Sequence, residues 1–227
     1  MRELRTQVLE ANLEIVRSGL VISTFGNASG IDRDSGRVVI KPSGVDYDRL
    51  ASDDLVVTDL EGVVVEGQLR PSSDLATHLE LYKAFPEIGG VVHTHSRYAT
   101  TWAQAGREIP CLGTTHADYF HGPVPLTEEL TQEEIESAYE VNTGKVIARR
   151  FQGVDPQRFP SVLVKGHGPF SWGKDALDAA HTAELLEEIA HIAYTTCVLN
   201  PNAKPISQSL LDKHFLRKHG PKAYYGQ

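Results

Sequence analysis

The chain has 227 residues, of which 41% are hydrophobic and 23% charged, a composition typical of a soluble globular protein with one domain. Its formal net charge of -8 argues against a general nucleic-acid-binding protein, whose contact surface would be basic. No apolar run is long enough to span a membrane, and the charged N-terminus lacks the apolar segment of a signal peptide. The two cysteines, Cys111 and Cys197, make no disulfide framework and fit a reducing compartment. We therefore expect one cytoplasmic domain over residues 1–227.

Strand-like and helix-like stretches alternate along the first half of the chain. Apolar residues at helical spacing predict a first helix that ends near Gly19. Strands are expected within 37–44 and 54–67, and the second of these stretches folds back as a hairpin near Glu61 and Gly62.

The next three elements surround an apolar run that carries two histidines. A helix is predicted over 73–85, with Ser73 or Asp74 near its N-cap and its end before Pro86. The run "GGVVHTH" (89–95) predicts a buried strand, and a helix is expected over 96–105.

The remaining elements continue the alternation. Thr131 and Glu134 form a possible capping box at the start of a helix over 130–140. The last predicted elements are a strand that enters a Gly-rich turn (161–173), a long helix (175–199), a final helix (207–220) and a polar, aromatic tail (221–227). Hairpin-linked strands argue against an all-parallel sheet. We expect an α/β fold, a layered α/β/α domain with a mixed, largely antiparallel central sheet.

His93 and His95 interrupt the apolar run 89–95 at positions i and i+2. In a strand, side chains at this spacing point to the same face, so the two imidazoles are expected to converge on one point. Neutral imidazoles are good Zn²⁺ ligands, but two of them do not complete a site. The pair therefore predicts part of a metal centre.

Further ligands must come from elsewhere in the chain. Three other histidines are candidates on spacing alone, namely His116, His121 and His167. His167 follows a predicted strand between two glycines that permit close backbone approach. Asp74 is a possible carboxylate ligand, although its position at a helix start is also that of a simple capping residue. The other histidines are expected to be ordinary surface or core residues: His78, His181, His191 and His219.

Three short polar stretches with Gly or Pro form a second theme: "TFGNASG" (24–30), "KPSG" (41–44) and "RPSSD" (70–74). Each is expected to be a loop. Backbone N–H groups, hydroxyls and the Lys41 ammonium are groups that bind a phosphate. None of the stretches matches the phosphate-binding loop of nucleoside triphosphatases or the glycine-rich motif of dinucleotide-binding domains. Together they favour a pocket for a small anionic molecule.

Taken together, these segments resemble the zinc-dependent class II aldolase/epimerase family over essentially the whole chain. The resemblance rests on "QVLEANL", "GN-S", "VIKPSGVDY", "PSSD-ATH", "GG-VHTHSRYAT-WAQAG", "GTTHADYF", "GHGPF-WGK", "LLDKH-LRKHG" and "KAYYGQ". Phe25 and Ala28 depart from the family's usual residues.

The resemblance implies a set of site residues. His93, His95 and His167 correspond to the zinc-binding histidines, and Asp74 to a carboxylate associated with the metal. The residues that match substrate and phosphate contacts are Gly26, Asn27, Lys41, Ser43, Gly44, Ser72 and Ser73. Asp118 and Tyr225 correspond to acid/base residues on two sides of the substrate, with the tyrosine supplied by an adjacent subunit of a homotetramer. Glu140 and His214 are expected to support the site.

The implied activity is the interconversion of L-ribulose 5-phosphate and D-xylulose 5-phosphate, in a pathway fed by L-arabinose or a related sugar acid. C4 of the substrate is not adjacent to the carbonyl, so the family inverts it by cleaving and re-forming the C3–C4 bond with Zn²⁺ as Lewis acid. One alternative is an aldolase of the same family that releases its fragments; Asp74 and the "YYGQ" tail argue against it. Another is a non-catalytic protein stabilised by zinc, but structural zinc usually binds cysteines, and the two cysteines lie outside the motifs.

Overall fold

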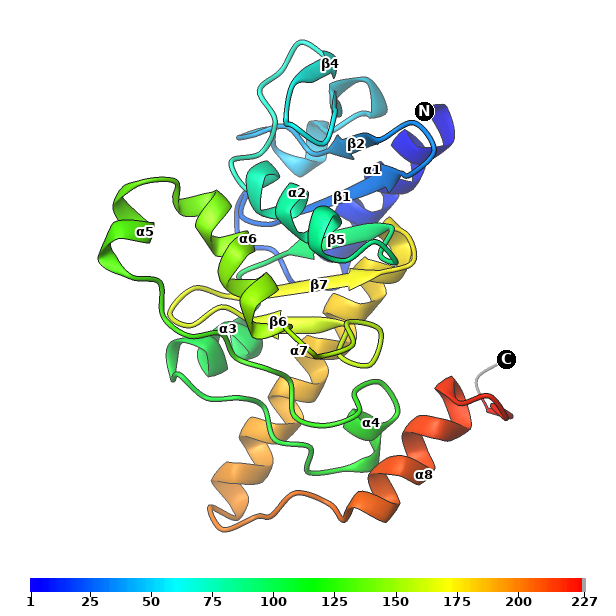
Figure 1. Ribbon diagram of the computed structural model, residues 1–227, viewed down its shortest axis with the longest axis vertical. Coiled ribbons are helices and arrows are strands. Elements are labelled where there is room, and N and C mark those ends of the chain that lie inside the picture. Colours follow the sequence, from blue (N-terminus) through cyan, green and yellow to red (C-terminus); the bar gives the residue numbers. More distant parts are fainter. Residues whose placement is uncertain (226–227) are drawn as a thin grey trace.

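Seven strands form one sheet in the computed structural model of the chain, which describes residues 1–225 (Figure 1). Their order across the sheet is β4-β3-β2-β1-β5-β7-β6, and neighbouring strands pair antiparallel throughout. The strands are β1 (Asn27–Asp32), β2 (Arg37–Ile40), β3 (Val56–Thr58), β4 (Val64–Glu66), β5 (Gly90–His93), β6 (Ser161–Leu163) and β7 (Pro169–Gly173). One isolated parallel bridge joins Leu126 to Leu163. The expectation of a layered α/β fold with a largely antiparallel sheet is confirmed.

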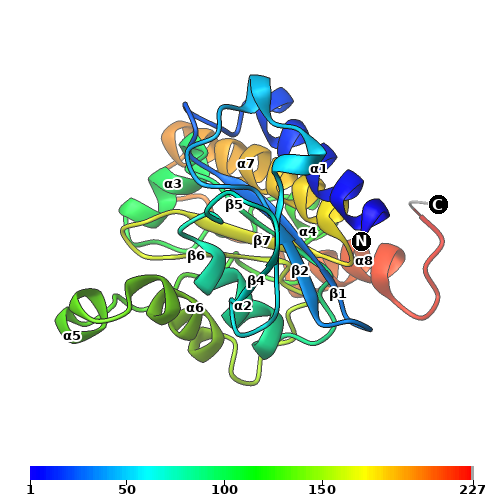
Figure 2. The same ribbon diagram turned by 90° about the horizontal axis from the view of Figure 1, so that it is seen from above.

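Helices cover both faces of this sheet (Figure 2). The helices are α1 (Arg2–Arg17), α2 (Leu75–Ala84), α3 (Arg97–Gln104), α4 (Thr114–Ala117), α5 (Gln132–Glu136), α6 (Tyr139–Arg150), α7 (Ala176–Leu199) and α8 (Gln208–His219), with 3-10 turns at Tyr47–Arg49 and Ser52–Asp54. One face packs against α1 and α7, and the other against α2 and α6. Within residues 1–225, no helix combines the length and apolar character needed to cross a membrane.

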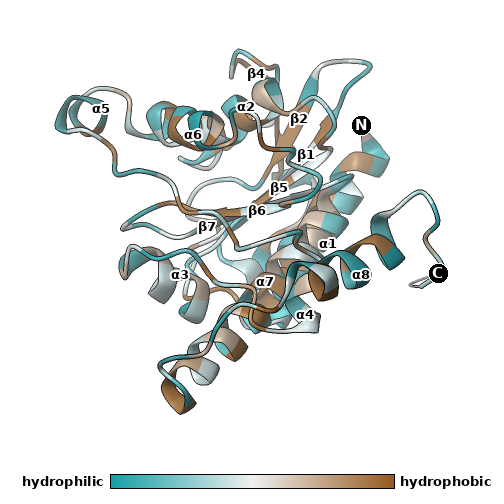
Figure 3. Cartoon of the chain, turned by 60° about the horizontal axis from the view of Figure 1, so that its bottom comes forward, coloured by the Kyte–Doolittle hydropathy of each residue, from teal (hydrophilic) through white to brown (hydrophobic). Residues whose placement is uncertain are grey.

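The strands supply core residues to both layers because their side chains alternate between the two faces. On β5, Val91 packs in the cluster that contains α2 and α6, whereas Val92 packs with α1 and α7. Figure 3 shows hydrophobic residues concentrated in the strands between the helical layers. The C-terminal end of α7 is also hydrophobic, but there Val198 and Leu199 are exposed, at 62% and 82%.

Most predicted elements are present with boundaries shifted by one or two residues. The hairpin near Glu61 and Gly62 is formed by β3 and β4. The capping box is present, since Thr131 Oγ1 accepts from the Glu134 N–H and the Glu134 carboxylate accepts from the Thr131 N–H. Asp175 likewise caps α7 by accepting from the Asp178 N–H.

The expectation of a loop over 24–30 is wrong, because its second half is β1, a central strand. Asn, Ser and Gly have low strand propensity, so the local pattern concealed it. Tertiary contacts stabilise the strand instead. The buried side chain of Asn12 hydrogen-bonds both the N–H and the C=O of Ala28. Gly30 leaves room for α1, because a Cβ there would lie 2.8 Å from a methyl carbon of Leu4.

Two further stretches differ from the prediction. Residues 161–173 form a complete hairpin, β6 and β7, rather than one strand entering a turn. The helix predicted over 130–140 is divided into α5 and the longer α6, which continues to Arg150. The break falls at Ser137, whose φ of -93° and ψ of -86° are not helical.

Candidate metal centre and substrate pocket

Three histidines from two neighbouring parts of the sheet converge on one point. His93 is the last residue of β5, and His95 follows just beyond the end of the strand. His167 lies in the turn between β6 and β7, and its ring centroid is 4.8 Å from that of His93 and 5.1 Å from that of His95. One ring nitrogen of each histidine lies within 4.8 Å of the others, a spacing that a metal ion can bridge.

The geometry and protonation of these rings suit a metal ion. The Nε2 atoms of His93 and His95 are 3.1 Å apart, and two ligand nitrogens of a tetrahedral Zn²⁺ are separated by about 3.3 Å. Nδ1 of His93 lies 3.0 Å from the carbonyl oxygen of Pro169, so this nitrogen donates and Nε2 keeps its lone pair. Burial lowers the pKa of His93 and lowers that of His167 to about 4. Both rings are therefore neutral at neutral pH, as ligation requires.

Two glycines in the turn between β6 and β7 allow the chain to bring the histidines together. Gly166 has a positive φ of 74°, which an L side chain rarely adopts. A Cβ on Gly168 would lie 2.9 Å from the carbonyl oxygen of Thr94, so the turn can pass close to the segment that carries His93 and His95.

Asp74 lies beside this cluster at the N-cap position of α2, but its side chain makes no capping hydrogen bond. Its carboxylate accepts instead from Nδ2 of Asn27 at 2.6 Å. Burial raises the pKa of Asp74, but the proximity of His93 and His78 and the bond from Asn27 outweigh it and hold the pKa below its usual value. Asp74 is therefore an anion next to the histidines, although within residues 1–225 the group with metal-ligand spacing comprises the three histidines alone.

A cavity of about 330 Å³ opens onto the histidines. It is lined by all three of them and by residues from the three polar stretches, which meet here although they are far apart in sequence. The predicted site residues among its lining are Gly26, Asn27, Lys41, Ser43, Gly44, Ser72, Ser73, Asp74, His93, His95 and His167. Pairing of β1 with β5 places Asn27 opposite His93, and backbone hydrogen bonds join Ser43 to Arg70 and Ser72 to Lys41.

The Lys41 ammonium is buried in the wall of this cavity. Its Nζ donates to the carbonyl oxygen of Val45 at 2.8 Å and lies 4.5 Å from the centre of the Tyr47 ring. Burial lowers its pKa. The Asp46 carboxylate is near enough to raise this pKa in part, but no carboxylate in the described part of the chain lies within ion-pair distance, so the ammonium could pair with an anion in the cavity.

His78 belongs to the surroundings of the site, although the sequence suggested an ordinary helix histidine. It is fully buried on α2, and its Nδ1 lies 2.7 Å from Oγ of Ser29, which is 2.8 Å from the hydroxyl of Tyr82. Burial lowers the pKa of His78 to about 3. The only signal in the sequence is its position four residues after Asp74, which places both on one face of the helix.

His116 and His121, the other two candidates for the third ligand, lie outside the cluster. His116 is buried on α4 and Nε2 donates to the carbonyl oxygen of Gly122. His121 pairs with Asp212 of α8 at 2.7 Å.

Asp118 and Tyr225 form a separate group at the junction of α4 and α8. Arg217 donates to both carboxylate oxygens of Asp118, and its guanidinium carbon lies 4.3 Å from the centre of the Tyr225 ring. His214 contacts the same carboxylate at 3.0 Å. Burial raises the pKa of Asp118, but the bonds from Arg217 and His214 hold it below its usual value. The ribbon places this junction far from the β6–β7 turn that carries His167 (Figure 1).

The remaining predicted positions are found as follows. Glu140, in the first turn of α6, accepts a 2.6 Å hydrogen bond from Thr77 through its backbone carbonyl. Gly226 and Gln227, the end of the "KAYYGQ" motif, lie outside the described residues. Sequence reasoning missed Tyr139, whose hydroxyl lies 3.3 Å from Nδ1 of His167, because nothing in its local pattern distinguishes it from a helix surface residue.

A layered fold of this kind, with three histidines at the edge of a polar cavity, fits a class of metal-dependent enzymes. The chain belongs to the family described as "Class II Aldolase and Adducin N-terminal domain", which it matches over residues 6–194. It is 56% identical over its full length, and over the full length of the relative, to L-ribulose-5-phosphate 4-epimerase UlaF of Salmonella paratyphi A, and equally to that of Salmonella typhi.

A solved structure with the same fold is an L-fuculose 1-phosphate aldolase. It is 25% identical, with a TM-score of 0.79, and the similarity covers 93% of this chain and 94% of that one.

Proposed function

We propose that the protein is an L-ribulose-5-phosphate 4-epimerase, an isomerase that interconverts L-ribulose 5-phosphate and D-xylulose 5-phosphate. The observation that carries this proposal is the 56% identity over the whole of both chains to relatives with that activity. The cavity fits the substrate class, because it combines a histidine cluster with hydroxyls, backbone N–H groups and a buried lysine.

His93, His95 and His167 would hold the metal, with Asp74 as the adjacent carboxylate. The histidine donor set and the spacing of the ring nitrogens fit Zn²⁺. When bound, the ion supplies Lewis-acid stabilisation of the negative charge that develops on the substrate oxygens. Histidine adds no negative charge when it binds a metal, so Asp74 would be the anion beside the ion, and the site would still attract an oxygen anion of the substrate.

Bond cleavage requires a proton acceptor and a way to hold the fragments. A base removes the proton from the C4 hydroxyl, C4 becomes the aldehyde of glycolaldehyde phosphate, and the C3–C4 electron pair remains as the enediolate of dihydroxyacetone. The aldehyde turns, the bond re-forms on its opposite face, and an acid returns a proton to the C4 oxygen. C4 is thereby inverted without deprotonation of the carbon itself.

The polar stretches would keep the phosphate fixed while the aldehyde turns. Lys41 offers a buried positive charge, and Ser43, Ser72 and Ser73 offer hydroxyls on the same cavity wall. Gly26, Asn27 and Gly44 complete that wall. Positive φ angles of 106° and 69° at Gly26 and Gly44 favour residues without a side chain at these turns.

Asp118 and Tyr225 are the proposed acid/base residues, supplied by a neighbouring subunit of a homotetramer. Within one chain they lie together at the α4–α8 junction and do not line the cavity with the histidines. The ionised Asp118 can accept a proton, and the Tyr225 hydroxyl can donate one. Tyr225 is 52% exposed. Hydrophobic residues at the end of α7 are exposed as well, as expected for surfaces that contact another copy of the chain.

We place the enzyme in the cytoplasm, in pentose phosphate metabolism fed by L-arabinose or a related sugar acid. Both cysteines are free thiols, as a reducing compartment would keep them.

The decisive experiment is turnover of L-ribulose 5-phosphate to D-xylulose 5-phosphate by the purified protein, before and after removal of metal and after addition of Zn²⁺. We expect activity that is lost on chelation and restored by zinc. Absence of turnover in the zinc-loaded protein would refute the assignment. If free dihydroxyacetone were the main product, the protein would instead be an aldolase, as is the solved relative.

A further inference from the structure

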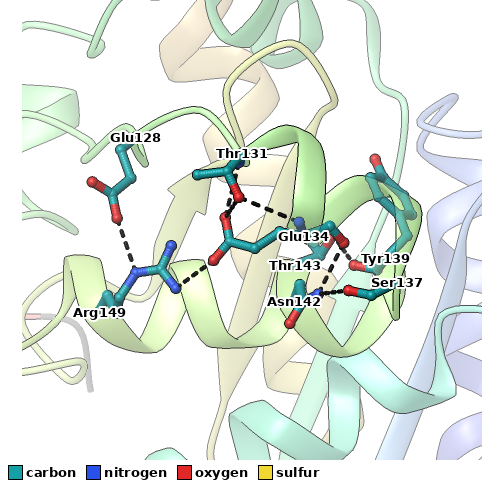
Figure 4. Close-up of polar contacts among 8 residues, drawn as sticks. All are labelled: Glu128, Thr131, Glu134, Ser137, Tyr139, Asn142, Thr143 and Arg149. Atoms are coloured by element: carbon teal, nitrogen blue, oxygen red, sulfur yellow. Dashed lines mark hydrogen bonds and ion pairs between the residues drawn. The ribbon is translucent and has the colours of Figure 1, made fainter.

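Tyr139 is the only residue among those described whose hydroxyl contacts a histidine of the metal centre. It is the first residue of α6, and its hydroxyl oxygen lies 3.3 Å from Nδ1 of His167. Figure 4 shows its ring at the start of the helix, directed away from the polar contacts of the α5–α6 turn.

The α5–α6 turn is held by hydrogen bonds that fix the start of α6 (Figure 4). The side-chain amide of Asn142 donates to the carbonyl oxygen of Glu134 at 2.8 Å and to Oγ of Ser137 at 3.1 Å. Thr143 Oγ1 donates to the carbonyl oxygen of Tyr139 at 2.9 Å. These bonds satisfy groups at the helix break and leave the backbone of Tyr139 with little freedom.

A second set of contacts fixes α6 against α2, the helix that begins after Asp74. Gly144 allows the two helices to approach closely, because a Cβ there would lie 2.4 Å from Cβ of Glu80. The bond from Thr77 Oγ1 to the carbonyl oxygen of Glu140 joins the first turn of α6 to α2. Tyr139 is therefore positioned by the packing of α6 against α2.

The direction of the Tyr139–His167 hydrogen bond follows from the requirements of the ligand. A histidine that gives the lone pair of Nε2 to a metal carries its proton on Nδ1, and an acceptor for that proton fixes the ring orientation. For His93 the acceptor is the carbonyl oxygen of Pro169. For His167 the atom in the corresponding place is the hydroxyl oxygen of Tyr139.

We propose that Tyr139 is a positioning residue of the metal centre: its hydroxyl oxygen accepts the Nδ1 proton of His167 and holds Nε2 toward the metal. This inference rests on the proposed function, since it assumes that His167 is a ligand. It assigns Tyr139 no contact with the substrate and no proton transfer.

The test is the substitution Tyr139→Phe, which keeps the ring and removes the hydroxyl. The dissociation constant of Zn²⁺ is measured by competition with a chromophoric chelator, and we expect it to rise about 10- to 100-fold, the usual effect of losing such a partner. The visible absorption spectrum of the Co²⁺-loaded variant should also change, because the orientation of one ligand is no longer fixed. The melting temperature of the metal-free protein should stay that of the unsubstituted chain.

Tyr194→Phe is the matched control, since this half-exposed tyrosine lies on α7 and should change none of these quantities. A zinc dissociation constant for Tyr139→Phe within twofold of the unsubstituted protein would overturn the inference. The inference would also be overturned if the melting temperature of metal-free Tyr139→Phe fell, because general destabilisation would then explain the weaker zinc binding. If the unsubstituted protein itself bound no zinc, the metal centre of the proposed function would fail together with the inference.

Discussion

Tyr225 is half exposed and stacked on the Arg217 guanidinium, so the loss of its hydroxyl should leave the fold intact. If Tyr225 and Asp118 act on opposite faces of the aldehyde, we expect Tyr225→Phe to lower kcat/KM by the same factor in both directions, because the group that donates a proton in one direction accepts it in the other and the equilibrium constant does not change. The measurement is the initial rate from each of the two pentulose phosphates. A kcat/KM close to that of the original chain would contradict an acid/base role for Tyr225. Tyr224→Phe, the neighbouring exposed tyrosine, is the control.

The buried imidazole of His116 contributes to the pH dependence of the protein's stability. Burial lowers its pKa in the folded chain to about 4, while the unfolded chain has the ordinary value near 6.5. Between these values the unfolded state binds a proton that the folded state does not, so this group makes stability rise with pH and fall as the solution is acidified below about 6.5.

In His116→Gln this contribution disappears, because glutamine does not titrate. We expect the slope of the unfolding free energy against pH, measured near pH 5 by urea denaturation, to decrease by about 1 kcal/mol per pH unit relative to the original chain. The amide can still donate to the carbonyl oxygen of Gly122, which His116 contacts now. An unchanged slope would show that His116 is protonated in both states.

At the scale of elements, the contact between α2 and α6 decides where Asp74 and Tyr139 stand relative to each other. Gly144→Ala forces a methyl group to within 2.4 Å of Cβ of Glu80. We expect it to destabilise the protein by about 1–3 kcal/mol, as overpacking does, and to weaken zinc binding because α6 shifts. Urea denaturation and zinc titration measure the two effects.

Gly113→Ala is the control for that substitution. Gly113 has an extended backbone with φ of -159°, and a Cβ there would meet nothing within 4 Å. Equal stabilities for Gly144→Ala and Gly113→Ala would mean that the two helices can separate without cost.

At the scale of the whole molecule, the separation of Asp118 from the histidine cluster predicts complementation between subunits. His95→Asn should fold, lose its metal and be inactive, and Asp118→Asn should bind metal and be inactive. When the two proteins are unfolded, mixed in equal amounts and refolded together, about a quarter of the sites should combine an intact metal centre with an intact neighbouring Asp118. The measurement is epimerase activity of the mixture, with each variant refolded alone as control.

Recovered activity near a quarter of the original would demonstrate shared sites. A mixture that forms hybrid oligomers and still shows no activity would contradict them and leave Asp118 without its proposed role.

The sequence alone determined the part of the site that depends on local geometry. The i, i+2 spacing of His93 and His95 was sufficient to predict their convergence, even though β5 ends at His93, because the extended backbone continues past the strand. Helix boundaries were likewise predictable where side chains cap the ends, as at Thr131 and Asp175. The resemblance to a family added the candidate role of His167.

Tertiary structure decided what no local pattern encodes. Residues 27–32 form a central strand because Asn12 and neighbouring strands satisfy their backbone, although their composition suggests a loop. Asp74 occupies a capping position but turns its carboxylate to Asn27. Tyr139 contacts His167 from the start of α6, a helix that Gly144 allows to pack closely on α2. Such contacts join residues tens of positions apart in the sequence, so they stabilise the local structure only after the chain has packed, and no local pattern predicts them.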